Sequence, residues 1–157
     1  MPTKKLKYAE LISQFPNCPP NNYKQVQMSA FRWVHSFEHE NDFRPINLIK
    51  NPPQRLLDDS DKMCIAYGIS LFESLDGACM KYKKLYNDRR EHLRPIFISD
   101  MGECVADLSL LKFDGLANDP EQKNFGHFTF HEYENVNLKL RIKSTYNIFG
   151  TDGKFIS

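Results

Sequence analysis

Five histidines make a metal site the first chemistry to consider in this sequence. His127 and His131 are four positions apart, and His35 and His39 repeat that spacing. On a helix such pairs face the same way, but on a strand they lie about 13 Å apart, too far to share one ion without ligands from elsewhere in the chain. Both pairs fall in or beside predicted strands, so we expect surface or hydrogen-bonded histidines and no metal site.

Basic side chains on one predicted helix are a second candidate. Tyrosines lie between the basic residues of this cluster, which are Lys81, Lys83, Lys84, Arg89, Arg90 and Arg94. Such a face can dock phosphate or an acidic protein, but Asp88 and Glu91 dilute its charge, and the formal net charge of +1 attracts polyanions weakly. We expect a largely solvated face, with protein favoured over nucleic acid. The interface candidates are Trp33, Lys81, Lys84, Arg89 and Arg90.

A third set of residues is spread along the whole chain. Arg32 ends the first predicted strand, Ser70 lies in a buried strand, and Glu132 and Glu134 share a late strand. Their order resembles the arginine–serine–glutamate layout of ADP-ribosyltransferases. The segment YGISLFESLDGACMKY, residues 67–82, is similar to the strand-then-helix segment of that family.

The resemblance implies NAD as co-substrate. In that family the arginine holds the dinucleotide phosphates, the serine supports the site and the second glutamate holds the nicotinamide ribose. By the same resemblance Arg32, Ser70 and Glu132 would bind the cofactor. Glu134 would be the catalytic carboxylate, stabilising the oxocarbenium-like sugar that forms as nicotinamide leaves. The family's Ser-Thr-Ser core reads Ile-Ser-Leu here, at residues 69–71.

Several standard motifs are missing from the sequence. Its seven glycines are dispersed and form neither a G-x-G-x-x-G nor a phosphate-binding loop. The sequence also has no H-E-x-x-H, G-x-S-x-G or EF-hand pattern. The mechanisms that depend on these local geometries are therefore excluded.

Composition predicts one globular domain over residues 1–157. The chain is 41% hydrophobic and 13% aromatic, enough to build a core. No stretch reaches the roughly 18 to 20 apolar residues that span a bilayer, and the N-terminus lacks the apolar core of a signal peptide. The cysteines show no C-x-x-C pairing, so we expect reduced thiols and a cytoplasmic protein without membrane contact; they are Cys18, Cys64, Cys79 and Cys104.

Hydrophobic periodicity predicts the elements. A short helix followed by a breaker covers residues 1–20, a strand 25–35, an ordered loop 38–61 and a buried strand about 63–72. The clearest helix spans about 75–92, with Ser74 as its N-cap. Strands follow over 95–100, 103–112, 126–133 and 135–143, with the last two as a hairpin. Residues 113–125 read as a surface loop and 147–157 as a tail or edge strand.

These elements favour an α+β single domain. We expect a curved antiparallel or mixed sheet of about six strands with one main amphipathic helix and a short N-terminal helix. Because the standard catalytic motifs are missing and the net charge is near zero, we predict a soluble intracellular interaction or accessory protein. It would bind another macromolecule, chiefly protein, without a cofactor. The alternative is an NAD-consuming ADP-ribosyltransferase-like enzyme or a degenerate relative. The two differ in whether Arg32, Ser70 and Glu134 meet in one cleft.

Overall fold

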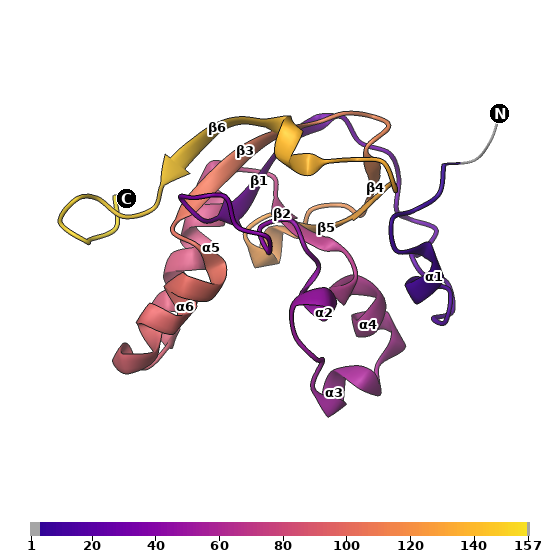
Figure 1. Cartoon of the computed structure of the whole chain (residues 1–157), viewed down its shortest axis with the longest axis horizontal. Helices are drawn as coiled ribbons and strands as arrows, with labels where there is room; N and C mark the ends of the chain where they lie inside the picture. The colour runs from indigo at the N-terminus through magenta and orange to yellow at the C-terminus, as the bar shows by residue number, and fades with distance from the viewer. Residues whose placement is uncertain (1–3, 157) are drawn as a thin grey trace.

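Six antiparallel strands form one open sheet in the computed structural model, which describes residues 4–156 (Figure 1). The spatial order is β4-β5-β2-β1-β3-β6. The predicted single-domain α+β fold is confirmed. The strands are β1 (Met28–Val34), β2 (Ile69–Phe72), β3 (Cys104–Leu110), β4 (Gly115–Ala117), β5 (His127–Glu132) and β6 (Ile142–Asn147).

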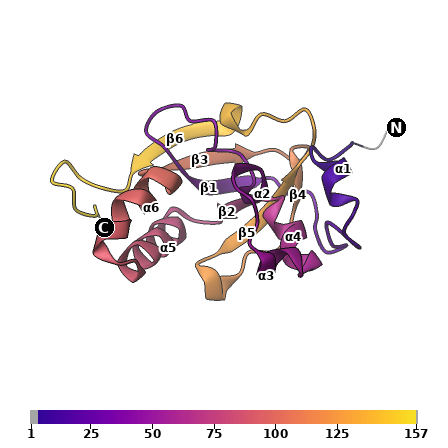
Figure 2. The ribbon, with the colours of Figure 1, turned by 60° about the horizontal axis from the view of Figure 1, so that its bottom comes forward.

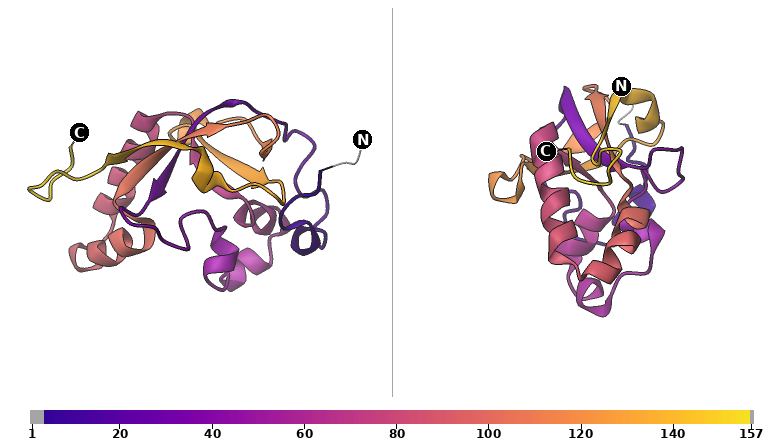
Figure 3. Two further views of the ribbon diagram at one scale, coloured as in Figure 1. Left: turned by 45° about the horizontal axis from the view of Figure 1, so that its top comes forward. Right: turned by 90° about the vertical axis from the view of Figure 1, so that its left-hand side faces the viewer.

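Two groups of helices flank the sheet. The long α5 (Leu75–Asp88) and α6 (Arg94–Met101) lie side by side, apart from a small lobe of α2 (Ile46–Ile49), α3 (Gln54–Leu57) and α4 (Ser60–Ala66) (Figures 2 and 3). The remaining helical turns are α1 (Ala9–Ile12), η1 (Glu91–Leu93), η2 (Gln122–Asn124) and η3 (Leu138–Arg141). Among residues 4–156 no helix is long and apolar enough to cross a membrane.

The main helix follows its prediction at the start and ends a little early. The Ser74 hydroxyl accepts a hydrogen bond from the Gly77 amide at 3.0 Å, as an N-cap should. Ala78 and Tyr82 on its apolar stripe are fully buried. The helix ends at Asp88 because Arg89 adopts extended backbone, and the chain continues into η1.

Strand register divides the core between the two faces of the sheet. Because opposite residues of antiparallel strands share a face, Ala30, Leu71 and Phe128 point to one side, and Trp33 and Phe72 to the other. The side that receives α5 and α6 is rich in aromatic residues. Its buried members are Phe72, Ala78, Tyr82, Phe97, Val105 and Ile148. The opposite face carries a second core whose buried members come from β1 to β5 and from Leu138 of η3, with the half-buried Ile142 of β6 packed against it.

Three segments predicted as strands are wholly or partly helical, the third being 135–143, in which residues 138–141 form η3. Residues 95–100 belong to α6, which accepts Pro95 in its first turn because a proline there gives up no intrahelical hydrogen bond. Residues 63–66 belong to α4, where the Asp59 carboxylate caps the Lys62 amide at 3.1 Å. An apolar run this short is compatible with either structure, and the caps decide it.

The predicted loop at 38–61 is more ordered than expected. Pro45 and Pro53 stand at the N-caps of α2 and α3, so the prolines begin short helices there. Likewise the segment 113–125 contains β4 and η2. The predicted N-terminal helix is reduced to the single turn of α1, and residues 1–3 lie outside the described part of the chain.

The predicted C-terminal hairpin is wrong. β5 pairs with β2 and β4, whereas the chain after it crosses over through η3 so that β6 pairs with β3. The tail then folds back on α5. Phe149 bridges Phe155, and their rings stack at 4.8 Å beside Tyr82 and Tyr86.

Two cysteines also depart from the sequence prediction. Cys18 and Cys64 form a disulfide that joins the N-terminal segment to α4, whereas Cys79 and Cys104 are free thiols as expected. The sulfurs are brought together across 46 positions of sequence, which no local spacing reveals. Cytoplasmic location stays a prediction, and disulfides persist mainly in oxidising compartments.

Reduction of the disulfide should destabilise the fold measurably. For a closed loop of this length, the loss of the cross-link lowers the free energy of unfolding by about 2–4 kcal/mol. Urea unfolding with and without reductant measures the difference. The double variant Cys18→Ser/Cys64→Ser serves as control, because reductant should leave its unfolding curve unchanged. Four titratable thiols in denatured, unreduced protein would contradict the disulfide.

Candidate functional site

The sheet parts between β1 and β2. β1 pairs with β3 along its whole length, but among residues 4–156 its pairing with β2 is limited to Phe31 opposite Phe72. The sheet therefore consists of two halves, β4-β5-β2 and β1-β3-β6, that diverge beyond this point. Main-chain groups at a parting of strands need other partners.

Arg32 supplies those partners. Its Nη1 donates to the Ser70 main-chain oxygen at 2.8 Å, and its Nε donates to the main-chain oxygen of Asp42. The guanidinium also lies over the Phe43 ring at 5.9 Å. One side chain thus connects β1, β2 and the loop that follows β1.

The charge of Arg32 is set by burial and by two carboxylates. Burial lowers the pKa of the guanidinium to about 10, and the negative charges of Asp42 and Glu132 oppose that fall. The side chain is still cationic at neutral pH. It therefore places a positive charge at the sheet parting, on the face that carries Ala30 and Leu71.

Glu132 points to the same face from β5. Its residue is only 3% exposed, and its Oε2 accepts a hydrogen bond from Lys7 Nζ at 2.7 Å. Burial raises the pKa of this carboxyl, and Lys7 and Arg32 offset part of the rise. Within the described chain no hydrogen-bond partner reaches Oε1. A buried carboxylate oxygen without a donor can accept a hydrogen bond from a ligand.

Ser70 and Glu134 are placed differently. Ser70 is opposite Thr129 in the β2–β5 register, so its side chain faces away from that of Arg32, and only its carbonyl meets the guanidinium. Glu134 is exposed beyond the end of β5, where its amide donates to the Lys5 oxygen at 2.9 Å. It lines a separate cavity of about 320 Å³ with the N-terminal segment. Arg32 therefore contacts the Ser70 main chain and shares a face of the sheet with Glu132, whereas the Ser70 side chain and Glu134 lie elsewhere.

The interface candidates lie on β1 (Trp33), on α5 (Lys81 and Lys84) and just beyond the end of α5 (Arg89 and Arg90). Trp33 packs on Tyr82 at 5.4 Å, and its indole donates to the Ala78 oxygen at 2.9 Å, so it is part of the core. Lys81 and Arg89 lie over the rings of Phe125 and Phe97. The other two are exposed. Lys84 pairs with Asp88 at 2.7 Å, and Arg90 lies at the end of the helix.

The histidines predicted on β5 behave as strand residues. His127 and His131 lie along that strand, and His131 is buried against the Tyr23 ring at 5.5 Å. Burial lowers the pKa of His131 to about 4, so this imidazole is neutral at physiological pH.

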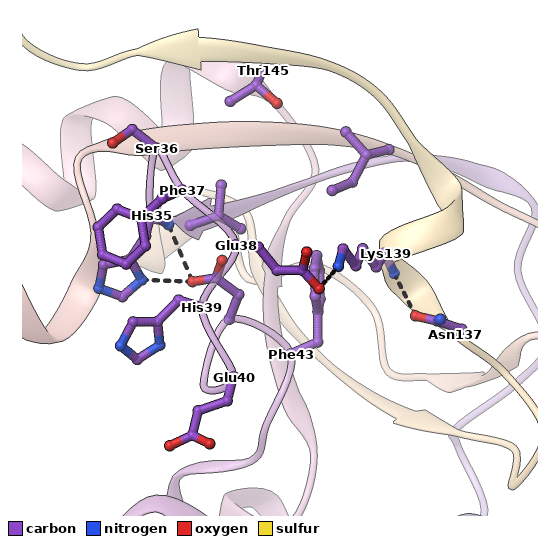
Figure 4. Close-up of a pocket in the computed structure, with 13 residues that line it drawn as sticks. His35, Ser36, Phe37, Glu38, His39, Glu40, Phe43, Asn137, Lys139 and Thr145 are labelled. Atoms are coloured by element: carbon purple, nitrogen blue, oxygen red, sulfur yellow. Dashed lines mark hydrogen bonds and ion pairs between the residues drawn. The ribbon is translucent and has the colours of Figure 1, made fainter.

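The earlier histidine pair forms a cluster that the strand spacing did not predict. His35 lies just beyond β1, and the following loop turns back so that the His35 and His39 rings stack at 4.0 Å (Figure 4). His35 Nδ1 lies 2.6 Å from Asp42 Oδ1, and its Nε2 lies 2.7 Å from the Ser99 oxygen. Burial opposes protonation, but these contacts raise the pKa of His35 above its usual value. The signal in the sequence is the spacing His-x₃-His-x₂-Asp at a strand end.

A cavity of about 590 Å³ opens beside this cluster. It lies between the loop after β1 and the β6 side of the sheet, with Val34, Phe43 and Ile142 as apolar lining (Figure 4). Lys139 closes one side through its ion pair with Glu38.

Comparison with family models, curated proteins and solved structures gives no significant match. Both candidate sites are therefore interpreted from their own geometry.

Removal of the Arg32 guanidinium should weaken the fold. Arg32→Ala leaves two main-chain carbonyls without donors and should lower the free energy of unfolding by about 3 kcal/mol, while Arg32→Lys, which cannot bond both in the same fork, should cost about half as much. Urea denaturation measures both. Arg55→Ala on the exposed face of α3 is the matched control, with an expected change near zero. Equal stability of Arg32→Ala and wild type would show that the guanidinium does not hold the two halves together.

Proposed function

We propose that this protein binds NAD and transfers its ADP-ribose group, with the site at the parting of β1 and β2. The observation that carries the proposal is that Arg32 bonds the Ser70 main chain and shares a face of the sheet with the buried carboxylate of Glu132, whose charge acts on the guanidinium. These residues lie far apart in the sequence, and their order had suggested a common site. A cation and a buried carboxylate with a free oxygen suit a dinucleotide that carries phosphates and ribose hydroxyls.

The proposed reaction breaks the bond between the nicotinamide nitrogen and the ribose anomeric carbon. The bonding electron pair leaves with nicotinamide, which departs as a neutral molecule. The oxocarbenium-like sugar is attacked by the lone pair of water or of a nucleophile on a target, and the nucleophile releases its proton to solvent. Glu132 would stabilise the positive charge that develops on the sugar, and Arg32 would bind the phosphates. In this proposal Glu132 takes the role that sequence order assigned to Glu134.

The N-terminal segment bears directly on this site. The Lys7 ammonium is held between Glu132 Oε2 and the Val136 oxygen, at 2.7 Å from each. It neutralises part of the charge that would stabilise the sugar. Glu132 Oε1 is buried and has no donor within the described chain, so binding of a ribose hydroxyl there would require the N-terminal segment to move aside.

A paired comparison of the two glutamates tests the proposal. NAD should raise the melting temperature of the wild-type protein, and the protein should release nicotinamide. Glu132→Gln keeps the shape of the side chain but removes its charge, so nicotinamide release should fall by about a hundredfold with the thermal shift largely kept. Glu134→Gln is the matched control and should behave as wild type, because its side chain lies outside the site.

The opposite pattern would reject this assignment. Loss of turnover in Glu134→Gln with Glu132→Gln unaffected would return the catalytic role to Glu134. Absence of both NAD-induced stabilisation and nicotinamide release would contradict NAD binding at this site.

Binding of another protein is a second candidate function. What favours it is a group of aliphatic side chains on the lobe of α2, α3 and α4, each at least 38% exposed: Ile46, Leu48, Ile49, Leu57 and Ile65. Apolar side chains gathered on a surface lobe are typical of contact surfaces. The macromolecule-binding function predicted from the sequence would use this lobe in place of the basic face of α5.

Self-association is the form of this second function that needs no further partner. Sedimentation velocity over a range of concentrations should show association for the wild type. Leu57→Lys should reduce that association, because it places a charge in the apolar group, while Met80→Lys on α5 serves as a control at another exposed apolar position. A wild type that stays monomeric at every concentration would exclude a second copy as the occupant of the lobe.

A further inference from the structure

We propose that His35, His39 and Asp42 bind one divalent transition-metal ion of the zinc class. One ligand atom from each residue can be chosen so that all three lie within 4.8 Å of one another. Two imidazoles and one carboxylate are a ligand set that suits zinc and its first-row neighbours. The inference is independent of NAD, because it rests on other side chains on the far side of Arg32.

The hydrogen bonds around His35 already orient it as a ligand. The Ser99 main-chain oxygen can only accept, so His35 Nε2 at 2.7 Å must carry the proton. A histidine ligand commonly donates its second N–H to a carbonyl in this way, which directs the other ring nitrogen to the metal. Nδ1 then faces Asp42 Oδ1 at 2.6 Å, with either a second proton or a metal ion bound to it.

Asp42 is held in place by the main chain. Its Oδ1 also accepts a hydrogen bond from the His35 amide at 3.1 Å, and its side chain is only 11% exposed. A carboxylate fixed by a main-chain hydrogen bond loses little freedom when it binds an ion. Its other oxygen is available for the metal.

His39 completes the set from the exposed side of the cluster. Its ring lies beside that of His35 in Figure 4, and the Asn41 amide donates to its Nδ1 at 3.1 Å. That contact fixes Nδ1 as the unprotonated nitrogen of His39, and a metal ion bound there would replace the Asn41 amide as the partner of its lone pair. The neighbouring residues Phe37, Glu38 and Glu40 are exposed, so the loop can adjust by the small rotation that coordination needs.

The charges around the cluster favour a cation. Glu38 is neutralised by Lys139, but the carboxylate of Glu40 lines the same cavity, and Asp42 is itself a ligand. All three residues line the cavity of about 590 Å³, so a fourth ligand could reach the ion from that cavity. Zinc sites with three protein ligands and one open position hold a water or an exchangeable ligand there.

Direct metal binding tests the proposal on the full chain after removal of metals with a chelator. Isothermal titration with Zn²⁺ should show one ion per chain, and Co²⁺ should produce the visible absorption of a low-symmetry cobalt site. His39→Gln should weaken Zn²⁺ binding by at least tenfold. Because His39 lies in the loop, this variant should keep its fold, as far-ultraviolet circular dichroism would verify.

Two matched variants distinguish Zn²⁺ binding at the cluster from non-specific binding at surface histidines. Asp42→Asn should weaken binding at least as much as His39→Gln, whereas His92→Gln, an exposed histidine on η1, should leave affinity and stoichiometry unchanged. Should Asp42→Asn fail to fold, His39→Gln and His92→Gln still decide the question. The proposal is overturned if the wild type binds no Zn²⁺, or if His39→Gln binds it as tightly as the wild type.

Discussion

Main-chain carbonyls at the parting of β1 and β2 need donors that the strands themselves cannot supply. The Arg32 guanidinium meets this need with two hydrogen bonds, to the oxygens of Ser70 and Asp42. A planar group with several fixed donors can join a strand and a loop in this way, which a lysine ammonium does less well. The relative position of the two sheet halves, and the return of the loop after β1, both depend on this side chain. Its cost is a cation partly removed from water, which the carboxylates of Asp42 and Glu132 offset.

The same arrangement places two kinds of chemistry on either side of Arg32. Toward β5 lies Glu132, a buried carboxylate with one oxygen bound by Lys7 and the other without a donor in the described chain. Toward the loop lies the cluster of His35, His39 and Asp42. The main-chain oxygen of Asp42 accepts a hydrogen bond from Arg32, and its carboxylate contacts His35. Order in the loop and order at the sheet parting are therefore coupled through one residue. A bidentate pair between Arg141 and Asp114, both bonds at 2.8 Å, anchors η3 near Glu132 from the other edge.

Local patterns in the sequence predicted those features that local physics decides. Ser74, the apolar stripe of α5 and the alternation of β1, β3 and β5 follow from side chains a few positions apart. Short apolar runs were misassigned where a cap or a proline decided the structure, as with Asp59 and Pro95. The cluster at His35 was missed because strand spacing does not apply once the chain turns back. The order of Arg32, Ser70 and Glu132 did not reveal that Arg32 bonds the Ser70 main chain, since the face of Ser70 depends on register and the position of Glu134 on where β5 ends. Pairings over long sequence distance, such as the disulfide and β3 with β6, leave no local trace.

The disulfide also gives the chain an unusual topology. Cys18 and Cys64 close a covalent ring that contains β1, the histidine loop, α2 and α3, while α5 and β5 lie outside it. Arg32 and Asp42 are inside the ring, and Glu132 is outside. A protease that cut an exposed bend in the helical lobe would open the ring without releasing a fragment. The nicked molecule would keep Arg32 and Glu132 attached to each other, and its two pieces would separate only after unfolding and reduction. Backbone integrity between residues 19 and 63 is thus not a condition for the chain to remain one molecule.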